Sequence, residues 1–191
     1  KEKFDFYFER CFWKDMSKVL SESKIVFNNA VRQDLNMRVF EALSTGSFLL
    51  TDKTNNSNQK NLFISGEDYY SYEDNTIKQS AEFFLENDEL RELIAQRGFE
   101  IVRNAHKYVD RCNDMLNVIK GNKSTTLTAN ELREKSLKNV NISTDKINKA
   151  KRSFVIPVID YSPASPFNIK TLLKDLEQIE GNVIIIFNSE K

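Results

Sequence analysis

Residues 34–52 read DLNMRVFEALSTGSFLLTD, the pattern of a short helix followed by a buried strand. Apolar side chains recur at helical spacing over residues 39–43. Either Asn36 or Asp34 can cap the free amides of the first helical turn. Gly46 is expected to end the helix, because glycine adopts the left-handed backbone conformation at low energetic cost. The stretch therefore predicts a helix with a polar start and a glycine stop.

An apolar run lies on each side of this helix. Residues 24–28 read KIVFN, and residues 48–50 read FLL. Both runs are short and continuous, which is typical of strands buried in a parallel sheet. The two runs and the helix together predict a βαβ unit, and we expect an α/β fold in which a parallel sheet is flanked by helices.

The loop before the helix predicts a ligand site. Open α/β folds bind ligands at the carboxyl end of the sheet, and a helix start attracts phosphate through its amides and dipole. Arg38 can fork onto phosphate oxygens, and Glu41, almost one turn further, can accept hydrogen bonds from a sugar diol. Binding of a nucleotide diphosphate requires both a phosphate-binding helix start and an acid that binds the sugar diol. From spacing alone, the same two residues also fit an ordinary solvated face, because one βαβ unit has many uses.

The same residues resemble a known family. DLNMRVFEALSTGSFLLTD, preceded by SKIVFN and followed by LFISGEDYYSYED, is similar to the C-terminal donor-binding domain of group 1 glycosyltransferases, in the branch of the CgeB-like spore maturation proteins. The resemblance covers roughly residues 17–118. It implies a partial Rossmann-like sheet, the C-terminal half of a GT-B fold. It also implies metal-independent transfer from a UDP- or GDP-sugar donor, with no cofactor.

The resemblance assigns roles to residues of the helix. Glu41 matches the glutamate that holds the ribose hydroxyls of the donor. Asn36, Met37 and Arg38 match the helix start that faces the donor diphosphate. The wider superfamily often has a second acid eight positions before the ribose glutamate, and Gln33 stands there in this chain.

Two further places match the family. Thr51 and Asp52, with Lys53, stand where a loop of the family lies near the donor; a solvated loop is the alternative interpretation. His106 and Arg111 match a pair that is common at this place in the family. Because the chain has one histidine, we expect a structural role for it, capping the C-terminus of a helix.

We expect three segments. Residues 1–121 are predicted to be a partial GT-B nucleotide-sugar-binding domain, and residues 122–152 a basic helical linker. The linker has eight Lys or Arg against three Asp or Glu, and a capping box of Thr128 and Glu131 predicts a helix around residues 129–139. Such a run can also contact anionic lipid or nucleic acid, but the absence of aromatic residues disfavours nucleic acid.

Residues 153–191 are predicted to be the truncated βαβ start of a second domain. Strand patterns over residues 154–159 and 183–187 enclose a helical stripe, and Pro157 indicates a strand end or an edge strand. The segment resembles the opening of glycosyltransferases of the GT-A type, a second and shorter resemblance.

The helical patterns give further expectations. Apolar residues recur at close to helical spacing over residues 1–23, which predicts one or two amphipathic helices. Three helices are expected after residue 75, and Gly98 inside the second indicates close packing against a neighbour. Cys112, on the apolar stripe of the third, is expected to be a buried small hydrophobe.

Composition excludes several classes of protein. Lys and Arg together number 28, as do Asp and Glu. The chain therefore has no net positive charge that would attract nucleic acid. No apolar run is long enough to span a membrane, and two cysteines are too few for a disulfide framework or a metal site. A cytoplasmic location is the simplest expectation.

Two functions are compatible with these observations. The first is a glycosyltransferase fragment that binds a nucleotide sugar and needs the remainder of its parent enzyme, because the family has further strands and an acceptor domain before this point. The second is a non-catalytic α/β scaffold or assembly module. Self-association is expected if aromatic surface is left open to water.

Overall fold

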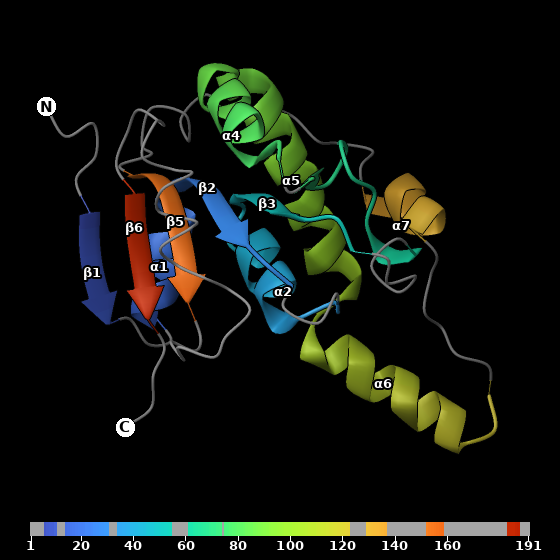
Figure 1. Cartoon of the computed structure of the whole chain (residues 1–191). Helices are drawn as coiled ribbons and strands as arrows, with labels where there is room; N and C mark the ends of the chain where they lie inside the picture. The colour runs from blue at the N-terminus through green and yellow to red at the C-terminus, as the bar shows by residue number, and fades with distance from the viewer. Residues whose placement is uncertain are drawn as a thin grey trace, which may run out of the picture.

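The computed structural model describes residues 6–10, 14–30, 34–54, 61–73, 75–122, 129–136, 152–158 and 183–187. The strands are β1 (Phe6–Arg10), β2 (Ser23–Asn28), β3 (Phe48–Asp52), β4 (Tyr70–Tyr72), β5 (Arg152–Val158) and β6 (Val183–Phe187). The helices are α1 (Lys14–Ser21), α2 (Met37–Ser44), α4 (Ile77–Glu86), α5 (Asp88–Ala105), α6 (Tyr108–Ile119) and α7 (Ala129–Ser136). A parallel sheet flanked by helices confirms the predicted α/β class (Figure 1).

The strands form one six-stranded sheet in the order β1-β6-β5-β2-β3-β4. Each neighbouring pair is parallel. The predicted βαβ unit is present as β2, α2 and β3, with Val26 opposite Leu49 in the register. Gly46 follows α2 with φ of 70°, so the predicted glycine stop is confirmed. Glycine reaches this left-handed conformation without the steric cost that a side chain adds.

Helices cover both faces of β2 and β3. On one face α1, α2 and the second half of α5 enclose a core that includes Leu20, Val26, Leu43, Leu49 and Ile101. This burial of apolar surface is the main source of stability for the unit. It also fixes the start of α2 over the ends of the central strands.

The other face of the sheet packs on α4. The ring centroids of Phe48 in β3 and Phe84 in α4 are 4.3 Å apart, and Tyr70 of β4 meets Phe84 at 4.8 Å. Aromatic pairs at these separations add to the burial of area alone. The central strands are therefore covered on both sides, as continuous apolar runs predict.

The first segment differs from expectation in one element. The prediction of amphipathic helices over residues 1–23 is right for α1 but wrong for residues 6–10, which form β1. β1 pairs along its whole length with β6, from Phe6 opposite Val183 to Arg10 opposite Phe187. Its backbone hydrogen bonds thus come from a strand at the far end of the sequence, which local spacing cannot reveal.

The two described strands of the predicted second domain lie in this same sheet. β5 pairs with β2, with Ile25 opposite Phe154, and β6 lies between β5 and β1. β2 and β1 thus supply parallel partners for these two strands, and the assignment of residues 153–191 to the start of a second domain stays a prediction. The helical stripe predicted between them lies outside the described residues.

Pro157 lies near the end of β5, beyond Val155, which is the last residue of β5 that pairs with β2. Its missing amide therefore falls outside that ladder. This agrees with the predicted strand end, although β5 is an internal strand of the sheet.

The prediction for α6 is wrong in one respect, the burial of its apolar stripe. None of its residues is buried, and Cys112 is exposed. Large apolar side chains of α6, including Tyr108 and Ile119, are exposed to solvent. Figure 1 shows α6 extending away from the sheet. Helical periodicity correctly identified an apolar stripe, but not whether other elements pack on it.

The helix α7 confirms a helix within the predicted linker, and it packs on α5. Arg133 of α7 forms ion pairs with Glu67 and with Asp68, whose side chain is fully buried. Thr128, half of the predicted capping box, lies outside the described residues. Among the helices that the structure describes, none has the length and apolar character needed to cross a bilayer.

Candidate functional site

Polar side chains meet where β2 and β3 end. Asn28, the last residue of β2, lies opposite Thr51 in the parallel register. The Asn28 amide donates to Thr51 Oγ1 at 3.1 Å, and the Thr51 hydroxyl donates to Asp52 Oδ1 at 3.1 Å. The same Asp52 oxygen accepts the backbone N–H of Ala30 at 2.7 Å. These bonds fix the chain as it leaves β2 at the carboxyl edge of the sheet, where α/β proteins bind ligands.

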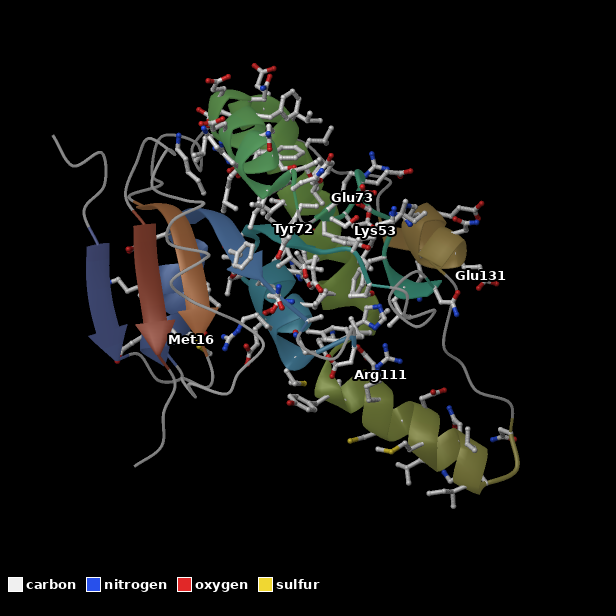
Figure 2. The ribbon with its side chains drawn as sticks, viewed as in Figure 1. Met16, Lys53, Tyr72, Glu73, Arg111 and Glu131 are labelled. Carbon is white, nitrogen blue, oxygen red and sulfur yellow. The ribbon has the colours of Figure 1, made fainter. Side chains whose placement is uncertain are left out.

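This polar row extends to β4. Asn29 Nδ2 donates to the hydroxyl of Tyr72 at 3.4 Å, and the Tyr72 ring stacks on Phe27 with centroids 5.4 Å apart. Figure 2 shows Tyr72 near Lys53 and Glu73, whose charged groups are 2.9 Å apart. Sequence reasoning missed Asn28, Asn29 and Tyr72. Their position at the ends of apolar runs is the signal that could have identified them.

Thr51 and Asp52, both predicted as donor contacts, differ in accessibility. Thr51 is completely buried, whereas Asp52 is partly exposed. Thr51 therefore supports the loop through its hydroxyl and offers no surface to a ligand. Asp52 holds the same loop through Ala30 and remains the more accessible of the two.

Asn36 occupies the position before the first residue of α2, as predicted, but its side chain does not cap the helix. The Asn36 amide instead donates to Asn28 Oδ1 at 3.4 Å. The first turn of α2 contains no acidic residue, and Met37 at its start is 54% exposed. The positive end of the α2 dipole is thus left without a carboxylate in its first turn, an arrangement that favours an anion.

Arg38 and Glu41 form an ion pair on α2. Arg38 Nη1 lies 2.9 Å from Glu41 Oε2; the Arg38 side chain is 4% exposed and that of Glu41 35% exposed. Burial lowers the pKa of Arg38, and the Glu41 carboxylate opposes that change. An ordinary solvated face is therefore excluded for Arg38. Glu41 is not sealed in the core and remains open to a ligand on one side.

His106 lies behind α2. It ends α5 through its backbone N–H, which donates to the Val102 carbonyl at 2.9 Å, and this confirms the predicted position at a helix C-terminus. Its ring packs between Phe40 and Phe63, with centroids 5.6 and 5.4 Å away. Burial and the neighbouring Arg111, labelled in Figure 2 at the start of α6, lower the pKa of His106 to about 4. The imidazole is therefore neutral at physiological pH.

The structure also contains a hollow of about 320 Å³ beside β4. Its lining includes Lys53, Thr54, Ser65 and Ser71. It adjoins the end of β3, but the predicted helix residues do not line it. The predicted site therefore lies outside this hollow. It is at the exposed edge formed by the loop after β2, the start of α2 and the end of β3.

The sequence-predicted residues are partly brought together. Hydrogen bonds run from Asn36 through Asn28 and Thr51 to Asp52. Glu41 lies one turn beyond the start of α2, paired with Arg38. This arrangement can bind a phosphorylated ligand at the helix start while a carboxylate accepts hydroxyl hydrogen bonds further along the helix.

Comparison with known proteins identifies a family. A family model described as glycosyl transferase-like matches residues 7–117, which is more than half of the chain and runs from β1 into α6. No curated protein and no solved structure matches the chain. The match confirms the glycosyltransferase resemblance, while the CgeB-like branch and the GT-A resemblance stay predictions. The chain belongs to the glycosyl transferase-like family.

Proposed function

We propose that the chain binds a nucleotide diphosphate sugar at the carboxyl edge of β2 and β3, as the donor-binding part of a glycosyltransferase. The observation that carries the proposal is the half-exposed carboxylate of Glu41, one turn beyond a helix start that the side chain of Asn36 leaves uncapped. The backbone amides near Met37 receive the diphosphate, and Glu41 accepts the ribose hydroxyls. Asp52 holds the β2 loop in place beside them.

The proposed reaction needs groups beyond this site. The amides and the dipole of α2 stabilise the negative charge of the departing diphosphate, a role in which preorganised donors are effective. In this proposal the remainder of the parent enzyme binds the acceptor substrate and supplies the base that activates it. We therefore expect little or no sugar transfer by the 191-residue chain on its own. Robust transfer by the purified chain would contradict this part of the proposal.

Isothermal titration calorimetry tests the binding step. The chain is titrated with UDP, GDP and their hexose derivatives, together with a Glu41→Gln variant. We expect saturable binding of one nucleotide series and an affinity loss of about tenfold or more in the variant, because the ribose hydroxyls no longer meet a charged acceptor. Glu86→Gln, at an exposed position of α4, is the matched control and should bind normally. Absence of binding by the wild-type chain contradicts the proposal.

A second candidate function is an assembly module that associates with copies of itself. The exposed apolar residues of α6, which include Met115 and Ile119, favour this candidate, because large apolar patches seldom stay open to water. Sedimentation velocity over a range of concentrations tests it. Self-association that an Ile119→Glu substitution abolishes supports the module, and a monomer at all concentrations contradicts it.

A further inference from the structure

Arg38 is buried at the place where the sequence predicts a phosphate contact. Only 4% of its side chain is exposed, and Nη1 lies 2.9 Å from Glu41 Oε2. The same nitrogen lies 3.2 Å from the sulfur of Met16, which α1 contributes. Figure 2 labels Met16, which lies on α1. The guanidinium would have to break both contacts before it could form a pair of hydrogen bonds with a phosphate at the surface.

The ion pair holds the Glu41 carboxylate in one place. The two residues are three positions apart on α2, a spacing at which side chains meet. Helical side chains lean toward the N-terminus of the helix, so the carboxylate is held toward the start of α2. Oε2 takes the ion pair, and within the described part of the chain Oε1 has no hydrogen-bond partner. The Glu41 side chain is 35% exposed, so a ligand can reach it from solvent.

We infer that Arg38 is a positioning residue: it orders the Glu41 carboxylate to accept the ribose hydroxyls, and the site thereby selects ribonucleotide sugars over 2′-deoxyribonucleotide sugars. The inference rests on the proposed function, since it takes Glu41 as the ribose acceptor. The charge of Arg38 is already balanced by Glu41. The diphosphate is therefore met by the backbone amides at the start of α2, not by Arg38.

The selectivity follows from the chemistry of the two sugars. A ribose presents two hydroxyl donors to the carboxylate, whereas 2′-deoxyribose presents one. Loss of one hydrogen bond to a charged acceptor lowers affinity by about tenfold or more. A glutamate without its arginine is no longer held in the orientation that accepts both hydroxyls at once. The second hydrogen bond, which only ribose can make, is then formed less often. Removing Arg38 therefore weakens the discrimination between the two sugars.

Two affinity ratios separate a positioning role from a phosphate contact. The chain is titrated with UDP, 2′-deoxy-UDP and UMP, and the corresponding guanosine and adenosine series are run in parallel. The deoxy ratio compares the Kd of the 2′-deoxy diphosphate with that of the ribose diphosphate. The phosphate ratio compares the Kd of the monophosphate with that of the diphosphate. We expect a wild-type deoxy ratio of about ten or more.

Arg38→Met is the main variant, because an unbranched apolar side chain preserves the contact with Met16. We expect its deoxy ratio to fall to about one to three, while its phosphate ratio stays at the wild-type value. Arg38→Lys restores a charge without the fork geometry, and its deoxy ratio should lie between the two. Arg103→Met, at an exposed position of α5, is the matched control and should change neither ratio.

The outcomes distinguish the inference from the proposed function. A phosphate ratio that falls in Arg38→Met, with the deoxy ratio unchanged, identifies a phosphate ligand and overturns the inference alone. Wild-type binding that does not distinguish ribose from deoxyribose also overturns it alone. Failure of the wild-type chain to bind any nucleoside diphosphate overturns the proposed function and the inference together.

A second pair of variants covers the case in which Arg38→Met does not fold. Arg38→Lys is then measured alone and in a Glu41→Gln background, with circular dichroism as the check on folding. If Arg38 acts through Glu41, the lysine substitution lowers the deoxy ratio in the wild-type background and has no further effect on it in the Glu41→Gln background. A further decrease there contradicts the positioning role.

Discussion

A β-carbon on Gly98 would lie only 2.4 Å from the carbonyl oxygen of Asp68 and 2.7 Å from Cδ2 of Leu43. The missing side chain lets α5 pack directly on α2 and on the turn before β4. This contact confirms the close packing that a glycine inside a helix indicated. It also explains why this long helix keeps a residue that costs about 1 kcal/mol relative to alanine in a helix interior.

Gly98→Ala is expected to destabilise the fold. The added methyl group meets a backbone carbonyl, which cannot turn aside as a flexible side chain can, so α5 must shift. We expect the free energy of unfolding to fall by about 1–3 kcal/mol, measured by urea denaturation. Met115→Ala, at an exposed position of α6, should change it by no more than about 0.5 kcal/mol. A stabilised Gly98→Ala protein would contradict the packing described here.

Arg133→Met is expected to destabilise the attachment of α7. The buried Asp68 carboxylate accepts the Ile64 N–H at 2.8 Å and pairs with Arg133, and burial raises the pKa of Asp68 despite these contacts. Removing one partner of a buried pair costs on the order of 3 kcal/mol. Urea denaturation measures the loss, and Lys135→Met, at an exposed position of α7, is the matched control. Equal stability of the two variants would contradict a structural role for the pair.

The pH dependence of stability should report on His106. Its pKa is lowered to about 4 in the folded chain, whereas an unperturbed histidine has a pKa of about 6.5. Between these values the unfolded chain binds a proton that the folded chain does not. Stability is therefore complete above about pH 6.5 and falls as the pH decreases toward 4, by on the order of 3 kcal/mol in total.

The difference between the wild-type chain and His106→Gln isolates this effect from the titrating carboxylates. Because the chain has a single histidine, no other imidazole contributes. We expect the stability advantage of the wild-type chain to shrink steadily between about pH 6.5 and 4. An advantage that is constant with pH would show that the imidazole is not kept neutral by folding.

Thr51→Val tests the hydrogen bonds at the carboxyl edge. Valine has the shape of threonine but leaves the Asn28 amide without the hydroxyl that accepts its hydrogen bond at 3.1 Å. The expected loss of stability is about 1–3 kcal/mol, because the amide is buried. Thr51→Ser keeps the hydroxyl and should retain more of the stability. Under the proposed function, Thr51→Val also weakens nucleotide binding, because Asp52 loses the hydrogen bond from the Thr51 hydroxyl.

Local pattern was sufficient for the unit of β2, α2 and β3. Strand, helix and glycine stop lie within one short stretch, and each is specified by side chains close to it in sequence. Pairing partners are different, because they come from elsewhere in the chain. Phe4, Phe8 and Phe12 fit a helical spacing, whereas Phe4, Phe6 and Phe8 alternate as in a strand. Residues 6–10 form a strand, and its parallel partner β6 lies far away in the sequence.

The candidate site shows the same limit. Spacing placed Arg38 and Glu41 on neighbouring turns of α2, and the ion pair bears this out. Spacing could not show that Met16, from α1, would close over the guanidinium and bury it. For a charged side chain on a helix, burial is decided by neighbours that the helix pattern does not contain, and burial determines which chemistry the group can perform.

The pairing of Ile25 with Phe154 has a consequence for synthesis. The ribosome completes β2 and β3 long before it reaches β5, so one edge of the central strand leaves the exit tunnel without its neighbour. Such an edge readily accepts a strand from another molecule, and pairings distant in sequence form slowly. The nascent chain is thus most exposed to aggregation while the ribosome is still translating the segment between β4 and β5.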